Sequence, residues 1–201
     1  MQELSPRGRR LKTDMDKLIQ LATTCSVLEL DLGQRGEFQY PESYIIGFQG
    51  PSFERTVNPF EYKVSLREHH QVRLTLGPQY PRLMPGLQWL TPIFHPNIAP
   101  NGSVCLGGYS THWAPRLMLD QLCEMLWDML VFRNFNLDSP YNREAAGWLQ
   151  QQTTFSLPLC RHGLRYFRRQ NESLSQPEGP VENTQRPVGP PDIQFLEESE
   201  S

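Results

Sequence analysis

The segment from Ile93 to Pro115 constrains the fold of this sequence more than any other stretch. Glycine and proline recur along it and predict a turned loop rather than a helix or a strand: Pro96, Pro100, Gly102, Gly107, Gly108 and Pro115. Apolar side chains at Phe94, Ile98 and Leu106 predict that this loop packs on a core. Long anchored loops inside compact domains are usually functional. This one contains a single cysteine, Cys105, which is therefore a candidate nucleophile.

The composition sets the limits within which this loop must be placed. The chain has 201 residues, of which 38% are hydrophobic and 20% charged, and a net charge of −3. These values fit one globular domain with a sizeable core. The acidic balance argues against a nucleic-acid partner. No run approaches the roughly 20 apolar residues of a membrane span, and the N-terminus lacks an apolar signal core. We therefore expect a cytoplasmic protein with no nucleic-acid or membrane partner.

The cysteines do not predict a metal site or a disulfide framework. The four are far apart in the sequence and lack metal-ligand spacing: Cys25, Cys105, Cys123 and Cys160. We expect reduced thiols, no metal and no cofactor.

A helix and then a series of strands are predicted before the loop. Ser5 and Pro6 form a helix start, with a serine cap followed by proline at the first helical position. The apolar residues that follow have helical period: Leu11, Met15, Leu18 and Ala22. The outer face of this helix is predicted to be basic, and the simpler interpretation is a solvated surface. The basic residues are Arg7, Arg9, Arg10, Lys12 and Lys17.

From Leu28 the hydrophobic period changes to two, which is typical of half-buried antiparallel strands. Four or five such strands are predicted: 28–32, 44–48, 60–66, 72–76 and 88–90. We expect Glu68–Gln71 to form a turn between two of them. His69 and His70 there are a weak metal candidate, because neighbouring strand residues point to opposite faces.

Helices are predicted after the loop. Asp120 is the expected cap of a nearly all-hydrophobic helix that contains Cys123, which we interpret as an inert core thiol. Another helix should start near Asn142 and break at Pro158, and a last one should run through Leu164 and Phe167. One helix, a meander of strands and helices on one face together predict an α+β fold.

Residues 171–201 differ from the rest in composition. They contain five prolines, seven acidic residues and one arginine. Such a segment buries too little apolar area to order itself. We predict a disordered, acidic, proline-rich tail after a domain formed by residues 1–170.

Four motifs in order give this sequence a family resemblance. His95-Pro96-Asn97 precedes Cys105, and Trp113-Ala114-Pro115 follows it, with the spacing of the active-site segment of ubiquitin-conjugating enzymes. Upstream, Tyr80–Pro85 resembles that family's Y-P-x-x-P-P. Downstream, Ser139–Ala146 resembles its S-P-x-N-x-x-A-A. The resemblance covers roughly residues 5–170. It implies the α+β ubiquitin-conjugating fold: an N-terminal helix, a four-stranded antiparallel meander, the active-site loop, then a central and a C-terminal helix.

The resemblance also implies an activity and its partners. Cys105 would accept ubiquitin or a ubiquitin-like protein from an activating enzyme as a thioester, and would pass it to an amine of a target protein or to a ligase. The loop would be structured by His95, Pro96, Trp113 and Pro115. The activating enzyme would dock on the basic first helix, through Arg9, Arg10, Lys12 and Lys17.

Two roles are open for Asn97, and two residues are candidates for receiving the amine. The Asn97 amide can donate to the oxyanion of the tetrahedral intermediate or pin the loop by hydrogen bonds, and these roles are compatible. Ser139 matches the family position that orients the amine. Asp138 is the better group chemically, because a carboxylate favours a nearby ammonium. Gly107 stands where the family often has Asp.

Two other functions compete with conjugation. The first is a non-catalytic binding module, although such relatives generally lack the cysteine. The second is a thiol hydrolase, which needs a general base near the sulfur and a third group to orient it. His95 and His112 are the candidate bases. No charged residue flanks Cys105, which favours a protein that holds a thioester without hydrolysing it.

Overall fold

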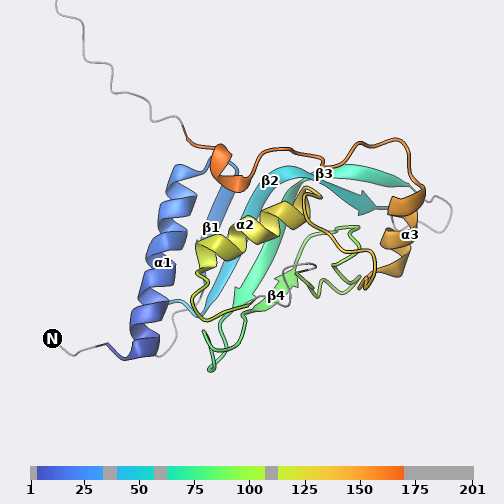
Figure 1. Ribbon diagram of the computed structural model, residues 1–201. Helices are drawn as coiled ribbons and strands as arrows, with labels where there is room; N and C mark the ends of the chain where they lie inside the picture. The colour runs from blue at the N-terminus through green and yellow to red at the C-terminus, as the bar shows by residue number, and fades with distance from the viewer. Residues whose placement is uncertain (1–3, 34–39, 57–62, 107–112, 170–201) are drawn as a thin grey trace, which may run out of the picture. The chain divides into compact units, whose positions relative to one another are not determined.

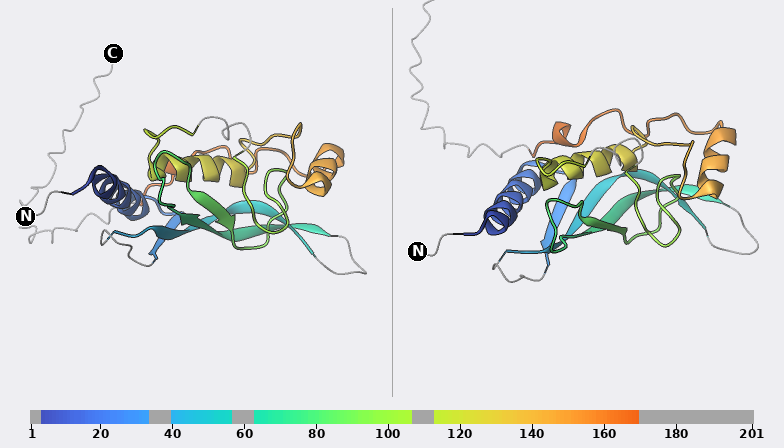
Figure 2. Two further views of the ribbon diagram at one scale, coloured as in Figure 1. Left: turned by 90° about the horizontal axis from the view of Figure 1, so that it is seen from below. Right: turned by 60° about the horizontal axis from the view of Figure 1, so that its bottom comes forward.

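The computed structural model describes residues 4–33, 40–56, 63–106 and 113–169. Its sheet has four strands in the order β1-β2-β3-β4, and every neighbouring pair is antiparallel. The strands are β1 (Leu28–Leu32), β2 (Ser43–Arg55), β3 (Val64–Thr75) and β4 (Gly86–Trp89). The predicted α+β meander is confirmed. Figure 1 shows the strands in this order, and the views of Figure 2 show α1 and α2 on one side of the sheet.

Helix α1 (Pro6–Thr24) begins as predicted. The Ser5 side chain accepts a hydrogen bond from the Gly8 amide at 3.1 Å, and Pro6 follows it. Its buried face differs from the expected stripe at two places, because Asp14 and Leu21 are buried where Met15 and Ala22 were expected. A carboxylate on the apolar face of a helix needs partners, and its partners turn out to include the segment that follows the cysteine loop.

The predicted turn at Glu68–Gln71 is wrong, because β3 runs through it without interruption. His70 pairs with Phe48 of β2, and its ring lies 5.9 Å from that of Trp89. His70 is 1% exposed, and burial lowers its pKa to about 4. Four consecutive polar residues resemble a turn in sequence, but the inward one of them is covered by the core. The predicted strand residues Phe60 and Tyr62 lie outside the described residues.

Helix α2 (Leu119–Leu130) crosses the sheet and forms the centre of the core (Figure 1). Leu122, Cys123 and Leu126 are fully buried, as predicted. Asp120 does not cap this helix. The cap is Met118, whose amide donates to the Gln121 side chain at 3.0 Å. Asp120 instead forms an ion pair with Arg165 at 2.7 Å.

The last part of the domain is less helical than predicted. Asn142 caps helix α3 (Arg143–Gln151) by accepting from the Ala145 amide at 3.0 Å, but α3 ends before Pro158 is reached. The expected last helix is only a 3-10 turn, η2 (Leu164–Tyr166). Within the described residues no helix is long and apolar enough to cross a membrane. The predicted tail at 171–201 lies outside the described residues and stays a prediction.

A second, smaller core supports the start of the cysteine loop. Phe53 of β2 packs against Phe132 at 5.0 Å between ring centroids and against Trp148 of α3 at 4.9 Å. Phe94 belongs to the same cluster, and its amide donates to the Phe53 carbonyl at 2.7 Å. The residue before His95 is therefore fixed to the sheet by both its backbone and its side chain.

Candidate active site

Cys105 lies in a narrow loop that folds back on itself. Ile98 and Val104 form an isolated antiparallel bridge, and the Cys105 amide donates to the Asn97 carbonyl at 2.9 Å. Leu106 is fully buried and anchors the chain directly after the cysteine. Cys105 itself is partly exposed. Cys105 is thus held by its backbone and remains partly exposed.

The tip of this loop requires glycine. Gly102 has a φ of +85°, in the left-handed region that other residues rarely adopt. A Cβ there would lie 2.2 Å from the Trp89 carbonyl oxygen. The Gly102 carbonyl accepts from the Trp89 amide at 2.8 Å, which ties the tip to β4. The Asn-Gly pair of the sequence is therefore the turn that returns the chain towards Cys105.

His95 braces the loop and is not available as a base. Its ring is fully buried and lies 4.6 Å from the Phe132 ring. Nδ1 accepts from the Asn97 amide at 3.0 Å, so the lone pair that a base would use is already occupied. Burial lowers the His95 pKa to about 3, and the backbone of Met129 only partly offsets this effect. The other candidate base, His112, lies outside the described residues.

Asn97 connects Cys105 to the opposite wall of the site. Its side chain is fully buried and forms a reciprocal pair with the backbone of Asn136. Nδ2 donates to the Asn136 carbonyl at 2.8 Å, and Oδ1 accepts from the Asn136 amide at 2.7 Å. The bracing geometry is thus present in the structure. An oxyanion role would use the second hydrogen of the same amide group.

Asn136 was not singled out from the sequence, yet it organises the edge of the site. Its Oδ1 accepts from the amides of Asp138 at 2.7 Å and Ser139 at 3.4 Å. Both Asp138 and Ser139 are exposed. A continuous chain of hydrogen bonds therefore runs from Cys105 through Asn97 and Asn136 to both candidate amine-orienting residues. Asparagine followed by an aspartate two positions later is typical of a local side-chain turn, which is the signal that the sequence contained.

The other motifs meet the loop at its two ends. The Pro96 carbonyl accepts from the Asn142 amide at 2.9 Å, so the H-P-N and S-P-x-N motifs are in direct contact. At the far end, the Trp113 indole donates to the Pro81 carbonyl at 3.0 Å. The Trp113 ring lies 6.1 Å from the Tyr80 ring. The four motifs are thus joined in two pairs: H-P-N with S-P-x-N, and Tyr80-Pro81 with Trp113. The first pair is bonded to Cys105 through Asn97.

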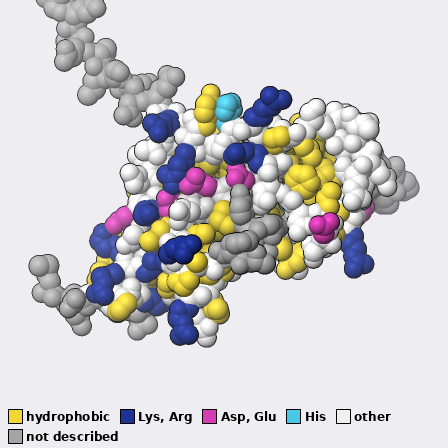
Figure 3. Space-filling model, in the orientation of Figure 1, with side chains coloured by type: hydrophobic (Ala, Val, Ile, Leu, Met, Phe, Trp, Pro, Cys, Tyr) yellow, Lys and Arg dark blue, Asp and Glu magenta, His cyan; other side chains and the backbone are white. Residues whose placement is uncertain are grey.

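The basic residues of α1 do not form a single surface. Figure 3 shows lysine and arginine side chains over α1, with acidic side chains among them. Arg9 and Lys12 are exposed and Lys17 is partly exposed. Arg10 is different, since only 11% of its side chain is exposed. It donates to the carbonyl of Pro115 and forms an ion pair with Asp14 at 2.6 Å. Its predicted place on the outer face is wrong.

The remaining cysteines have less suitable surroundings for acyl transfer. Cys25 and Cys123 are buried, and burial raises the pKa of both thiols. Cys160 is partly exposed, and its thiol faces the His162 carbonyl at 3.8 Å. Among the described residues, no three His, Cys, Asp or Glu side chains are grouped closely enough to hold a metal ion.

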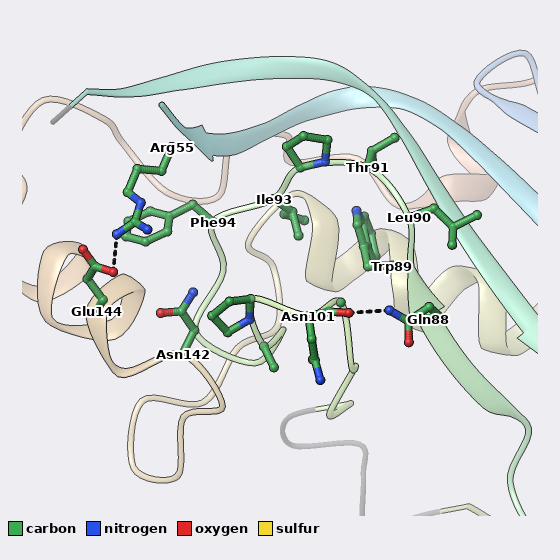
Figure 4. A pocket seen from close by; sticks show the side chains of 14 residues that line it. Arg55, Gln88, Trp89, Leu90, Thr91, Ile93, Phe94, Asn101, Asn142 and Glu144 are labelled. Atoms are coloured by element: carbon green, nitrogen blue, oxygen red, sulfur yellow. Dashed lines mark hydrogen bonds and ion pairs between the residues drawn. The ribbon is translucent and has the colours of Figure 1, made fainter. Parts of the chain in front are cut away.

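A hollow of about 470 Å³ lies beside the loop (Figure 4). Its wall includes Trp89, Asn101 and the Arg55–Glu144 ion pair. Gln88 donates to the Asn101 carbonyl at 2.5 Å across one side of it. Cys105 is not among the described residues that line this hollow. The hollow is therefore a neighbouring feature of the surface and not the place of the thiol.

Comparisons with known proteins identify the family of this chain. Residues 43–157 match the family described as ubiquitin-conjugating enzyme. Ubiquitin-conjugating enzyme E2 S of Drosophila mojavensis is 33% identical over 82 residues, and the same protein of Drosophila grimshawi has the same identity and span. The alignment with the first covers 41% of this chain and 39% of the relative, so the chain spans about two fifths of these relatives' length.

Solved structures extend the similarity over most of the domain. Ubc12 of S. cerevisiae has a TM-score of 0.55 and 25% identity, with 76% of this chain and 75% of that chain covered. A putative ubiquitin-conjugating enzyme of Plasmodium yoelii has a TM-score of 0.53 at 20% identity, covering 75% and 88%. The latter similarity concerns the fold alone. The family match spans more than half of the sequence, and the chain belongs to the ubiquitin-conjugating enzyme family.

Proposed function

We propose that this protein is an active conjugating enzyme that carries ubiquitin or a ubiquitin-like protein as a thioester on Cys105. The Cys105 thiolate attacks the thioester carbonyl of the modifier on an activating enzyme, and the activating enzyme's thiolate leaves. An amine of a target, or the cysteine of a ligase, then attacks the new thioester and releases the Cys105 thiolate. The supporting observation is a partly exposed cysteine held by the backbone of Asn97.

The surroundings of Cys105 support a carrier rather than a hydrolase. A thioester survives only where no strong base activates water beside it. His95 is fully buried, has a pKa of about 3 and already accepts a hydrogen bond at Nδ1. A hydrolase would need this ring to be protonated near neutral pH during catalysis. The hydrolase hypothesis is therefore disfavoured for His95, the only one of the two candidate bases that is described.

The amine step would use the edge formed by Asp138 and Ser139. Asn136 holds the amides of both residues, and Asn97 holds Asn136. Asp138 would favour an ammonium near the thioester and take its proton as attack proceeds, while Ser139 would orient the amine. Residues 1–170 would form the catalytic domain. The exposed Arg9 and Lys12 and the partly exposed Lys17 of α1 would contact the activating enzyme.

Incubation with ubiquitin or a ubiquitin-like protein, its activating enzyme and ATP tests this function. We expect an adduct that disappears on treatment with a thiol reductant and is absent from Cys105→Ala. Cys105→Ser should give a reductant-resistant oxyester or no adduct. An adduct of undiminished yield on Cys105→Ala would contradict the proposal, and no adduct with any modifier would favour a binding module.

A further inference from the structure

Arg10 and Asp14 form a buried polar cluster with Tyr80, here called the Asp14 cluster. Asp14 is fully buried. It accepts from Arg10 Nε at 2.6 Å and from the Tyr80 hydroxyl at 2.5 Å. Burial and the Asp14 carboxylate raise the pKa of Tyr80, so its hydroxyl stays a donor. The Arg10 guanidinium also lies over the Tyr80 ring, 5.1 Å from its centroid.

The cluster holds the segment that leaves the cysteine loop. Arg10 donates to the backbone carbonyls of Pro115 and Leu117. Leu119 is the first helical residue of α2, and its amide donates to Asp14 Oδ1 at 3.1 Å. A carboxylate at this end of a helix also interacts favourably with the helix dipole. Three successive attachment points, at 115, 117 and 119, therefore belong to two side chains of α1.

The same cluster reaches the motif residue on the other side of the loop. Tyr80 lies 6.1 Å from the Trp113 ring, and the next residue, Pro81, accepts from the Trp113 indole at 3.0 Å. The cluster thus contacts Pro115 through Arg10, and it lies beside Trp113 through the ring of Tyr80. A lysine at position 10 would keep the charge, but it lacks the planar fork that serves Asp14, Tyr80 and two carbonyls at once.

We propose that Arg10 and Asp14 are positioning residues that fasten the far end of the cysteine loop to α1. Arg10 then acts on the chemistry of Cys105 through the segment Trp113–Leu119 and not by contact with the activating enzyme. This inference rests on the proposed carrier function, and it reassigns Arg10 from a docking surface to the active-site framework. It also means that side chains of α1 help to fix the position of the loop.

The test is Arg10→Lys, with Arg165→Lys as the matched control. Like Arg10, Arg165 forms an ion pair with a helix carboxylate, but it lies on η2, and its partners Asp120 and Glu124 do not belong to the loop. We expect Arg10→Lys to slow discharge of a preloaded thioester to free lysine by about ten-fold, in line with the cost of misplacing a loop away from the chemistry. The KM for the activating enzyme should stay at the parent's value. Arg165→Lys should discharge at the parent's rate.

Three results would overturn the proposal. One is an Arg10→Lys protein with a raised KM for the activating enzyme and unchanged discharge, which would make Arg10 a docking residue. The second is equal slowing in Leu18→Val, a core variant of α1, at the same loss of Tm, since the effect would then be general destabilisation. The third is unchanged hydrogen exchange in Arg10→Lys at the Leu117 and Leu119 amides, which donate to Ala114 O and Asp14 Oδ1 in the structure.

Hydrogen exchange also separates this inference from the proposed function. If the parent protein forms no thioester with any modifier, the carrier function fails while the exchange comparison can still be made. Faster exchange at Leu117 and Leu119 in Arg10→Lys and Asp14→Asn, with parent-like exchange in Arg165→Lys, would then support the fastening by itself. Should Asp14→Asn fail to fold, Tyr80→Phe replaces it, because it removes one donor to Asp14 and one acceptor of Arg10 but leaves the Arg10 bonds to Asp14, Pro115 and Leu117 in place.

Discussion

The two walls of the candidate active site are built differently. On one wall, His95 and Asn97 are fully buried. The Asn97 side chain bonds to the backbone of Asn136, and its backbone carbonyl accepts from the Cys105 amide. On the other wall, Asp138 and Ser139 are exposed, and Asn136 accepts hydrogen bonds from their amides. One wall is a buried framework, and the other consists of exposed residues.

This difference separates positioning from proton chemistry. Groups that fix geometry can be buried, because their hydrogen bonds are made within the protein. Groups that meet a protonated amine must stay solvated to remain charged without a large desolvation cost. Asn136 joins the two walls through its backbone on one side and its side chain on the other. Substitutions on the two walls should therefore have different signatures.

The largest expected effect concerns the thiol itself. Cys105→Ala should abolish the reductant-sensitive adduct, whereas Cys160→Ser should load like the parent. Cys160 is the matched control because it is the other partly exposed cysteine among the described residues. Gel analysis of the loading reaction with and without reductant measures both. Normal loading of Cys105→Ala would remove the reason to regard either wall as part of an active site.

The next largest effect is expected from removing the hydrogen bonds between the Asn97 side chain and Asn136. Asn97→Ala removes the partners of the partly buried amide and carbonyl of Asn136. The loss of stability should stay below the roughly 1–3 kcal/mol that a fully buried unsatisfied group costs, because water can reach them. Discharge to lysine should slow by about 100-fold, which is the lower end of the range for loss of an oxyanion donor. Loading of Cys105 should slow less than discharge. Single-turnover discharge and thermal unfolding measure the two effects.

Asn136→Ala distinguishes the two roles of Asn97. This variant keeps the backbone groups that pair with Asn97 but removes the acceptor for the Asp138 and Ser139 amides. If Asn97 acts by placing the exposed wall, Asn136→Ala should reproduce the discharge defect with a smaller loss of Tm. Parent-like discharge of Asn136→Ala would instead assign the Asn97 effect to the oxyanion.

The sequence predicted the framework of the fold and the motifs that meet at Cys105, because these depend on local periodicity and spacing. It did not predict residues whose partners are distant in sequence. Arg10 appeared to be a surface residue, although Asp14, four positions later on the apolar face, was a signal of a buried pair. The Asn97–Asn136 pair spans 39 residues, and no local pattern identifies it. Glu68–Gln71 failed because a short polar run is shared by turns and by strands that bury one polar side chain.

Buried histidines should make stability depend on pH. The pKa values of His70 and His95 are lowered to about 4 and about 3 in the folded state. An unfolded histidine titrates near a pKa of about 6.5, so below this pH the unfolded chain binds protons that the folded chain does not. The free energy of unfolding should therefore decrease as the pH is lowered from about 6.5 towards 4. The decrease should be up to about 1.4 kcal/mol per pH unit for each histidine.

The neighbouring histidines provide the control for this effect. His70→Gln should flatten the decline between pH 6.5 and pH 4.5, and His69→Gln, at the exposed neighbouring position, is the control. Urea unfolding at a series of pH values gives the slopes. Identical slopes for the two variants would mean that the burial of His70 does not control its protonation. The comparison avoids the contribution of carboxylates, since both variants retain all of them.

The smallest expected effect lies on the exposed wall and decides between Asp138 and Ser139. We expect Asp138→Ala to slow discharge to free lysine several-fold at neutral pH, where the amine is almost wholly protonated. A carboxylate helps by attracting the ammonium and taking its proton as attack proceeds. The loss should therefore shrink as the pH approaches the lysine reference pKa of about 10.4. It should also shrink at high salt, because exposed charges are screened over about 8 Å at physiological ionic strength.

Asp138→Asn keeps the size of the side chain and should behave like Asp138→Ala, while Ser139→Ala should have a smaller effect that varies little with pH. If Ser139→Ala is the more damaging change and Asp138→Asn is silent at every pH, the exposed wall orients the amine by hydrogen bonding and its charge has no part in the transfer.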